Sequence, residues 1–285
     1  MSRVGRLAPT PSGHLHLGNA LSFGACWLSA RGPRDLPAGR VLLRIEDIDR
    51  GRSRPDIADS QRRDLEWLGL HWDEEVAPQS TRVYSTDGLP TYRCDCTRRE
   101  RKARPCPHRD QPAETGAVRL RSALQPVPFV DRVFGPQRVA PDHDALLVRK
   151  SGDVGYPLAV VTDDHRDGVT EVVRGADLLH PTATQVELYR LRGWAEPTWL
   201  HAPLLLGADG RKLGKSHGST ELRALRAQGW TAGAVWRLLL PLLGCEADQI
   251  DHAVLDPARI PRHSFTVIEH SDRIRIEPAG PPIDW

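Results

Sequence analysis

The sequence has 285 residues, of which 39% are hydrophobic, and its formal net charge at pH 7 is +2. This composition suits one substantial α/β domain with a smaller appendage, and the near-neutral charge gives no overall sign of a nucleic-acid partner. No apolar run approaches the roughly 18 residues of a membrane span, no apolar signal segment opens the chain, and the five cysteines are too unevenly placed for a disulfide framework. We therefore expect a soluble cytoplasmic protein that does not contact a membrane.

The beginning of the chain follows a strand–turn–helix pattern. Val4–Leu7 is predicted as a strand and Asn19–Arg31 as the helix that follows it. Residues 8–18 between them contain two prolines and two glycines, which indicate a tight turn. A turn at the carboxyl end of a first strand presents backbone N–H groups and a helix N-terminus to an anion. This turn is therefore a candidate phosphate site.

A second strand and a second helix come next. Arg40–Ile45 is nearly continuous in apolar residues, as strands of parallel sheets are, and acidic residues follow it at 46–49. Ligands of open α/β sheets bind at that carboxyl edge. An amphipathic helix is predicted around residues 57–68. From about residue 73 to 141, prolines, arginines and cysteines replace the alternation, which predicts an inserted subdomain with little regular core.

The alternation returns after the insertion. The predicted strands are Ala145–Arg149, Val169–Val173 and Trp199–Leu206, the predicted helix is Thr182–Arg192, and the apolar segment 156–163 fits either type. Ala232–Leu243 is predicted as an apolar helix kinked at Pro241, with an irregular tail after it. We therefore divide the chain into the first half of a catalytic domain (1–72), the insertion (73–141), the second half (142–216) and a short helical C-terminal region (217–285).

Two stretches far apart in the chain carry the functional signal. Residues 6–19 read RLAPTPSGHLHLGN and residues 210–216 read GRKLGKS. Together they resemble the two signature motifs of class I aminoacyl-tRNA synthetases, the second in the place of the lysine loop written KMSKS. Further blocks at 44–49, 156–165 and 168–177 resemble the glutamyl branch of that class. The resemblance implies a Rossmann-like catalytic domain and ligase activity.

In that class, the carboxylate of an amino acid attacks the α-phosphate of ATP and expels pyrophosphate. Charge grows on the phosphoryl oxygens, so the site needs positioning and hydrogen-bond donors more than covalent catalysis. His16 in the turn, with Lys212 and Lys215 in the loop, are the predicted catalytic donors. ATP, with Mg²⁺, is expected to contact His16, Gly18, Asn19 and Lys215. The other histidine of the turn, His14, is predicted to be a surface residue.

The glutamyl resemblance implies an amino-acid pocket formed by Arg6, Ala8, Thr10, Glu46, Tyr156 and Arg174. Glutamate brings two carboxylates and one ammonium group, so a selective pocket needs arginines and one acid. Arg6 and Arg174 are the expected partners of the carboxylates, in an order left open, and Glu46 is the expected partner of the ammonium. Without the resemblance, surface ion pairing would explain the same charges.

The insertion contains four potential metal ligands. Cys94-x-Cys96 is followed by Cys106-x-His108, a spacing suited to a tetrahedral structural Zn²⁺; ordinary free thiols are the alternative. The related family places a Tyr-x-x-x-Cys pair after its Cys-x-Cys, so this would be a changed ligand set. The basic run 98–104 between the ligands is predicted as either a solvated face or an RNA-phosphate surface.

Only about 70 residues follow the lysine loop in this sequence, fewer than an anticodon-reading domain needs. Length, block order and the cysteine cluster resemble the glutamyl-queuosine tRNA(Asp) synthetase family. That resemblance implies activation of L-glutamate without tRNA and its transfer to the queuosine base at the wobble position of tRNA(Asp). We expect a monomer. The alternatives are a truncated or paralogous glutamyl-tRNA synthetase that charges the tRNA 3′ end, a nucleotidyltransferase of the same superfamily, and an inactive tRNA-binding paralogue.

Overall fold

The computed structural model describes residues 3–33, 38–214, 220–269 and 274–279. Its N-terminal part is built on a parallel sheet in the order β1-β2-β3, formed by β1 (Val4–Leu7), β2 (Arg40–Leu43) and β3 (Glu74–Glu75). The apolar residues of β2 are all buried, which explains its continuous apolar pattern. The first predicted strand is confirmed, whereas the second ends two residues earlier than predicted.

A second sheet, in the order β7-β6-β10-β9, continues this layer. Its strands are β9 (Glu171–Gly175), β10 (Thr198–Ala202), β6 (Val127–Asp131) and β7 (Gly135–Val139). β9 lies beside β1, because the N–H of Thr170 donates to the carbonyl of Val4 at 3.0 Å. β6 and β7 come from the segment predicted to be an insertion, so its last part packs into the second sheet as regular structure that the sequence pattern did not predict.

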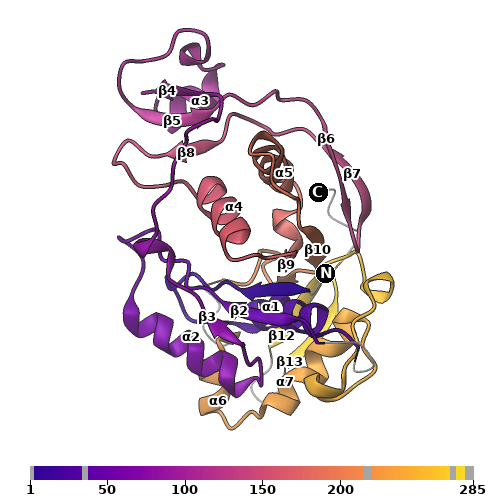
Figure 1. Ribbon diagram of the computed structural model, residues 1–285. Helices are drawn as coiled ribbons and strands as arrows, with labels where there is room; N and C mark the ends of the chain where they lie inside the picture. Colours follow the sequence, from indigo (N-terminus) through magenta and orange to yellow (C-terminus); the bar gives the residue numbers. More distant parts are fainter. Residues whose placement is uncertain (1–2, 34–37, 215–219, 270–273, 280–285) are drawn as a thin grey trace.

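Helices cover both faces of the sheet layer (Figure 1). On one face lie α1 (Leu17–Arg31) and α2 (Pro55–Trp67), and on the other α4 (Tyr156–Arg166) and α5 (Thr182–Leu191). Two apolar cores correspond to the two faces, the first around α1 and the second around α4 and α5. The segment of ambiguous type, 156–163, is therefore helical. This two-sided arrangement is the α/β fold that the sequence predicts.

The first part of the insertion contributes two strands to a separate small sheet in the order β4-β5-β8, at the top of Figure 1, and the third strand, β8, comes from the segment after the insertion. Its strands are β4 (Thr91–Cys94), β5 (Ala117–Leu120) and β8 (Leu146–Val148). The short helix α3 (Arg98–Ala103) lies in the long connection between β4 and β5. That connection also contains three of the four potential metal ligands, and the fourth, Cys94, ends β4.

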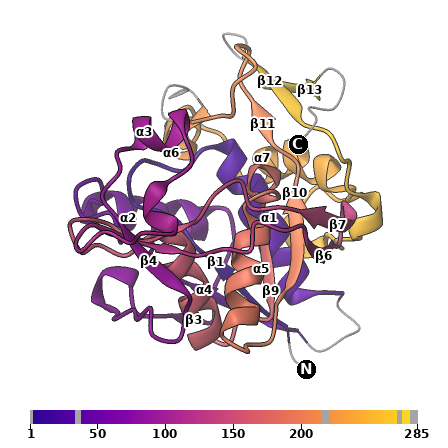
Figure 2. The ribbon, with the colours of Figure 1, turned by 90° about the horizontal axis from the view of Figure 1, so that it is seen from above.

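The C-terminal part begins with two short helices, α6 (Leu222–Ala227) and α7 (Ala232–Leu239). The chain changes from α-helix to 3₁₀-helix at residues 240–243, around the predicted kink at Pro241. The prediction of an irregular tail was wrong in part, because β12 (Phe265–Glu269) and β13 (Ile274–Pro278) form a further sheet with β11 (Leu205–Leu206) at the edge of the molecule (Figure 2). None of the helices that the structure describes is both long and apolar enough to cross a membrane.

Candidate active site

The turn between β1 and α1 is held in place by a side chain from α2. Gln61, which is 1% exposed, donates through Nε2 to the carbonyl oxygens of Thr10 at 2.9 Å and Gly13 at 2.7 Å. Backbone carbonyls of a loop need partners when they approach the protein interior. The position of the turn therefore depends on a residue about fifty positions further along the chain, which the sequence pattern did not identify.

His16 is the N-cap of α1, and for this reason the helix starts at Leu17, two residues before its predicted start. Its Nδ1 accepts the N–H of Gly18 at 3.1 Å, while the side chain of Asn19 accepts the N–H of His16 at 3.0 Å. Because Nδ1 is an acceptor, the proton of the neutral imidazole lies on Nε2. A Cβ on Gly18 would stand 3.0 Å from the imidazole Cε1, so the glycine makes room for the His16 ring.

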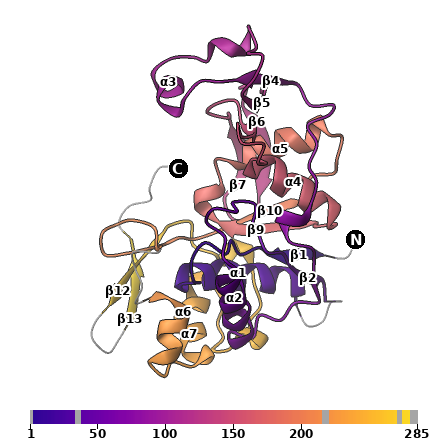
Figure 3. The same ribbon diagram turned by 90° about the vertical axis from the view of Figure 1, so that its left-hand side faces the viewer.

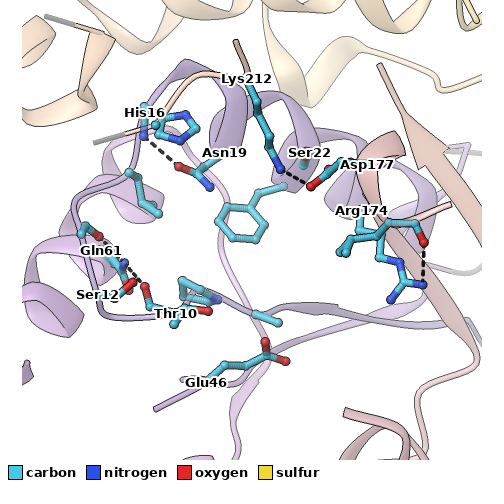
Figure 4. A pocket seen from close by; sticks show the side chains of 18 of the residues that line it. Thr10, Ser12, His16, Asn19, Ser22, Glu46, Gln61, Arg174, Asp177 and Lys212 are labelled. Carbon is cyan, nitrogen blue, oxygen red and sulfur yellow. Dashed lines mark hydrogen bonds and ion pairs between the residues drawn. The ribbon is translucent and has the colours of Figure 1, made fainter. Parts of the chain in front are cut away.

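A cavity of about 420 Å³ opens at the carboxyl ends of β1 and β9 (Figure 4). This volume suits a small-molecule site. The cavity brings together every residue predicted to bind glutamate and three of those predicted to bind ATP or act in catalysis, namely Arg6, Ala8, Thr10, Glu46, Tyr156, Arg174, His16, Asn19 and Lys212. Gly18 lines a smaller hollow beside it. Lys215 lies outside the described residues.

Arg6 and Glu46, which line one side of the cavity, belong to a cluster of buried ion pairs. Asp164 accepts from Arg6 Nε at 3.1 Å and from Arg44 Nη2 at 2.7 Å. Arg44 also pairs with Glu46 at 3.1 Å and with Asp167 at 3.0 Å. Burial is the largest single influence on the pKa of Arg6 and acts to lower it, but Asp164 and the other groups with the opposite effect together raise the pKa. The pKa of Glu46 is also raised, because burial outweighs the opposing effect of Arg44 and Arg6.

Arg174 is also buried, at 6% exposed, but it is held by uncharged groups instead of carboxylates. Its guanidinium donates to Gln185 Oε1 at 2.8 Å and to Thr182 Oγ1 at 2.7 Å. Its Nε donates to His201 Nε2 at 3.1 Å, so His201 carries its proton on Nδ1, 2.7 Å from Asp131. No carboxylate among the described residues forms an ion pair with Arg174. Burial accordingly lowers its pKa.

Lys212 reaches the cavity from the loop that follows β11. Its Nζ lies 2.6 Å from a carboxylate oxygen of Asp177, and both side chains are partly exposed (Figure 4). Exposed ion pairs of this kind contribute little to stability, about 0–1 kcal/mol. The ammonium group can therefore exchange Asp177 for a phosphate at small cost.

The four potential metal ligands converge in the insertion, with their ligand atoms all within 4.8 Å of one another. The Sγ atoms of Cys94 and Cys106 are 3.4 Å apart, and Cys96 Sγ is 3.3 Å from His108 Nδ1. Ligand atoms of a tetrahedral zinc site lie about 3.3–3.8 Å apart. His108 Nε2 is 3.2 Å from Asp95 Oδ1, the kind of carboxylate partner that orients metal-bound histidines. The residues therefore fit a structural Zn²⁺.

The sequence pattern did not identify the residues that hold the two arginines of the cavity. Asp164 contacts Arg6 and His201 contacts Arg174, and both are polar residues inside apolar segments that form α4 and β10. A charged or polar residue in a buried segment needs a partner. That signal was present in the sequence, although it does not show which partner each residue meets.

Comparison with known proteins agrees with this geometry. The family model "tRNA synthetases class I (E and Q), catalytic domain" matches residues 3–93 and 90–255. Among solved structures, a glutamate tRNA ligase from Elizabethkingia meningosepticum superposes with a TM-score of 0.76 at 23% identity, covering 93% of this chain and 67% of that chain. At that identity the likeness establishes the fold.

Curated relatives are more similar in sequence. The glutamyl-Q tRNA(Asp) synthetase of Nitratidesulfovibrio vulgaris is 40% identical, covering 88% of this chain and 90% of that protein. That of Symbiobacterium thermophilum is also 40% identical, with 92% and 95% covered. A glutamate–tRNA ligase 2 from Cereibacter sphaeroides is 37% identical over 84% of this chain but only 56% of its own length. The chain belongs to the glutamyl-Q tRNA(Asp) synthetase family of class I tRNA synthetases.

Proposed function

We propose that this protein activates L-glutamate with ATP, without tRNA, and transfers the glutamyl group to queuosine at the wobble position of tRNA(Asp). In the first step the α-carboxylate attacks the α-phosphorus of ATP, the bond to the β-phosphate breaks and pyrophosphate leaves. In the second step a hydroxyl of the queuosine cyclopentenediol attacks the glutamyl carbonyl and loses its proton, and AMP leaves. The reaction takes place in the cytoplasm, where tRNA is found.

The observation that carries the proposal is the buried Arg174. A guanidinium removed from water is costly unless it has an anionic partner. Its hydrogen-bond acceptors within the described residues are neutral, so the positive charge is not compensated by an ion pair. We therefore propose that a carboxylate of glutamate is its anionic partner. Arg6, which Asp164 already neutralises, has a smaller need for an anion.

The third charge of glutamate, its ammonium, is assigned to Glu46. This carboxylate lines the same cavity, is 6% exposed, and shares Arg44 with Asp164. Burial raises the pKa of Glu46, so an added positive charge nearby would favour its ionised form. Two cations and one buried acid thus face a ligand with two negative charges and one positive charge. A neutral or purely anionic substrate would leave one of these groups without a partner.

Stabilisation of the transition state is assigned to His16, Lys212 and Lys215. Because His16 Nδ1 accepts the N–H of Gly18, the donor that the imidazole offers is Nε2–H. Lys212 supplies a charged donor after leaving Asp177. Loss of one such donor costs roughly 10²–10³ in rate. Mg²⁺ bound with ATP would add charge neutralisation at the phosphates.

We also propose that Cys94, Cys96, Cys106 and His108 hold a structural Zn²⁺ that fixes the connection between β4 and β5. We expect about one zinc per chain by metal analysis, and less in Cys106→Ala. A matched control is Cys245→Ala, because Cys245 is buried in the C-terminal core, away from the cluster. Purified protein without zinc at stoichiometric level would contradict this assignment.

The test of the function is ATP–pyrophosphate exchange with glutamate in the absence of RNA. Wild-type protein should exchange, while aspartate should not replace glutamate and Lys215→Ala should lower the rate at least 10²-fold. Labelled glutamate should then be transferred to tRNA(Asp) containing queuosine but not to the same tRNA with unmodified guanosine. No exchange under any condition would contradict the proposal and favour an inactive tRNA-binding protein.

A second candidate is charging of the tRNA 3′ end, which the likeness to glutamate–tRNA ligase 2 favours. Removing the 3′-terminal adenosine of the tRNA distinguishes the two reactions. Transfer to queuosine should survive the removal, whereas 3′ charging cannot. We further propose that one chain suffices, since one chain supplies all the residues assigned above.

A further inference from the structure

A second hollow, of about 590 Å³, lies between α2 and α6. Figure 3 shows these two helices side by side, on the face of the sheet layer opposite to the small sheet of the insertion. Among the described residues, four arginines and one aspartate line the hollow. The arginines are Arg54, Arg63, Arg223 and Arg226, and the aspartate is Asp56. The near-neutral charge of the whole chain therefore conceals a locally basic surface outside the active site.

The arginines of this hollow are available to an incoming anion. Arg54 pairs with Asp56 at 2.7 Å and Arg223 with Glu221 at 2.7 Å, and in both pairs the arginine is exposed. Such pairs are weak and exchange readily. Arg63 is exposed and forms no ion pair with any described residue. Arginine binds phosphate through two parallel N–H···O bonds, which makes it the preferred residue for a phosphodiester.

Arg226 is held at the hollow by a carboxylate behind it. Asp64 is fully buried and stands 3.5 Å from Arg226 Nη2. Neither of its oxygens has a hydrogen-bond partner in the described part of the chain. Asp64 thus attracts the guanidinium without fixing its N–H groups by hydrogen bonds. Arg226 thus stays at the edge of the hollow, and its N–H groups can donate to a second anion.

The hollow shares a wall with the active-site cavity. His14 lines both, and its Nδ1 is 3.1 Å from Ser60 Oγ on α2. His14, which was predicted as a surface residue of the turn, is half-buried and lies between the two sites. A nucleotide whose base reacts in the cavity carries backbone phosphates on the sugar attached to that base. The shared wall puts the arginines where such a phosphate can reach them.

We infer that the hollow between α2 and α6 binds a backbone phosphate of the RNA substrate, next to the nucleotide whose base receives the glutamyl group. The inference rests on the proposed function for the identity of the RNA, but the phosphate contact can be tested separately. It differs from the predicted surface at residues 98–104, which lies in the insertion. It adds an RNA-binding site on the catalytic domain itself.

The test is the double variant Arg63→Gln/Arg223→Gln. We expect glutamate-dependent ATP–pyrophosphate exchange within twofold of wild type, because no RNA is present. For transfer to queuosine-containing tRNA(Asp), kcat/KM should fall at least tenfold through a higher KM. The dependence of log Kd for tRNA on log salt should decrease by about 0.7, because the variant removes the contact to one phosphate of a single-stranded loop. Arg237→Gln, an exposed change on α7, is the matched control and should change neither quantity.

Three results would overturn the inference. The first is unchanged tRNA affinity and salt dependence in the double variant. The second is a loss of exchange without RNA, which would place the arginines in activation. The third is a loss of affinity only in Arg99→Gln/Arg104→Gln, which would move the phosphate contact to the insertion. Direct tRNA binding needs no turnover, so it tests the hollow even if wild-type protein shows no exchange and the proposed function fails.

Discussion

Two walls of the active-site cavity each contain a buried arginine, and they treat its charge in opposite ways. Arg6 and the neighbouring Arg44 share the carboxylate of Asp164. Arg174 is held by a hydroxyl, an amide oxygen and an imidazole nitrogen. The pKa of Arg6 is raised, because Asp164 and other anionic neighbours together outweigh its burial, whereas the pKa of Arg174 is lowered by burial. The charge of Arg6 is thus already compensated within the protein, whereas that of Arg174 is left for an anionic ligand.

This difference shows how a cavity can be both preformed and selective. The compensated wall stays assembled without a ligand, because each buried charge there already has a partner. The uncompensated wall keeps its guanidinium oriented by hydrogen bonds but leaves its charge for the substrate. Substitutions at Arg174 should therefore affect mainly glutamate binding, and substitutions at Asp164 mainly the stability of the fold.

The largest effect is expected for Arg174→Gln. The variant removes the positive charge that pairs with a carboxylate of the bound glutamate. We therefore expect kcat/KM for glutamate in the exchange assay to fall on the order of 10³-fold, about 4 kcal/mol. The melting temperature should stay equal or rise slightly, because a buried charge without an ion pair is removed. Thermal unfolding and exchange kinetics on the same preparation check both points. A fall below tenfold would make Arg174 a structural residue like Arg44.

Asp164→Asn should give the converse result. It leaves Arg6 and Arg44 with less negative charge in a buried setting, so we expect the free energy of unfolding to decrease by about 3 kcal/mol. Denaturant titration measures this loss. Asp177→Asn is the control, because its pair with Lys212 is partly exposed and should change stability by less than about 1 kcal/mol. Equal losses of unfolding free energy in the two variants would contradict the prediction, because the buried ion pairs would then contribute no more than the exposed one.

A smaller effect is expected for His201→Asn, which weakens the support of Arg174. A hydrogen bond to a charged group contributes about 1.5–3 kcal/mol, so KM for glutamate should rise roughly tenfold or more while KM for ATP stays unchanged. Asp131→Asn should act in the same direction through His201. Burial lowers the pKa of His201, so its neutral form persists as the pH falls. KM for glutamate should therefore stay flat between about pH 8 and 6.5, and a rise within that range would contradict this role.

A residue of the cavity could be predicted where its position depends on neighbouring residues in the sequence, and not where it depends on a distant contact. The turn residues and Glu46 follow directly from strand ends, because the carboxyl edge of a parallel sheet is a local feature of each strand. The charge balance could not be predicted, since the partner of Arg6 is 158 positions away in the sequence. The four ligands at 94–108 lie in one short stretch, so their spacing alone was enough to bring them together.

The strands β6 and β7 show a different limit of sequence reasoning. The prolines of this segment, with its arginines and the cysteines before it, indicated an insertion with little regular core. In the fold, Pro136 lies on β7, an edge strand, where a missing N–H breaks no ladder. Gly135 has a φ of +76°, which closes the hairpin. Pro136 is thus compatible with a hairpin at the edge of the sheet, which only the pairing partners reveal.

The smallest expected effect concerns Asp64, whose burial is compensated only in part. Burial raises its pKa to about 6, against the lowering effect of Arg226 and other nearby arginines. Between about pH 4 and 6 the unfolded chain has lost this proton while the folded chain still holds it, so the free energy of unfolding decreases as the pH rises. Because water and the arginines screen the site, Asp64→Asn should stabilise the protein by about 1 kcal/mol at about pH 7.5 and by almost nothing at about pH 4. Denaturant titrations at the two pH values measure this.

A variant that is less stable than wild type at the higher pH would contradict the prediction. It would show that the attraction between Asp64 and Arg226 exceeds the cost of burial, so that Asp64, like Asp164, stabilises the fold through its ion pair.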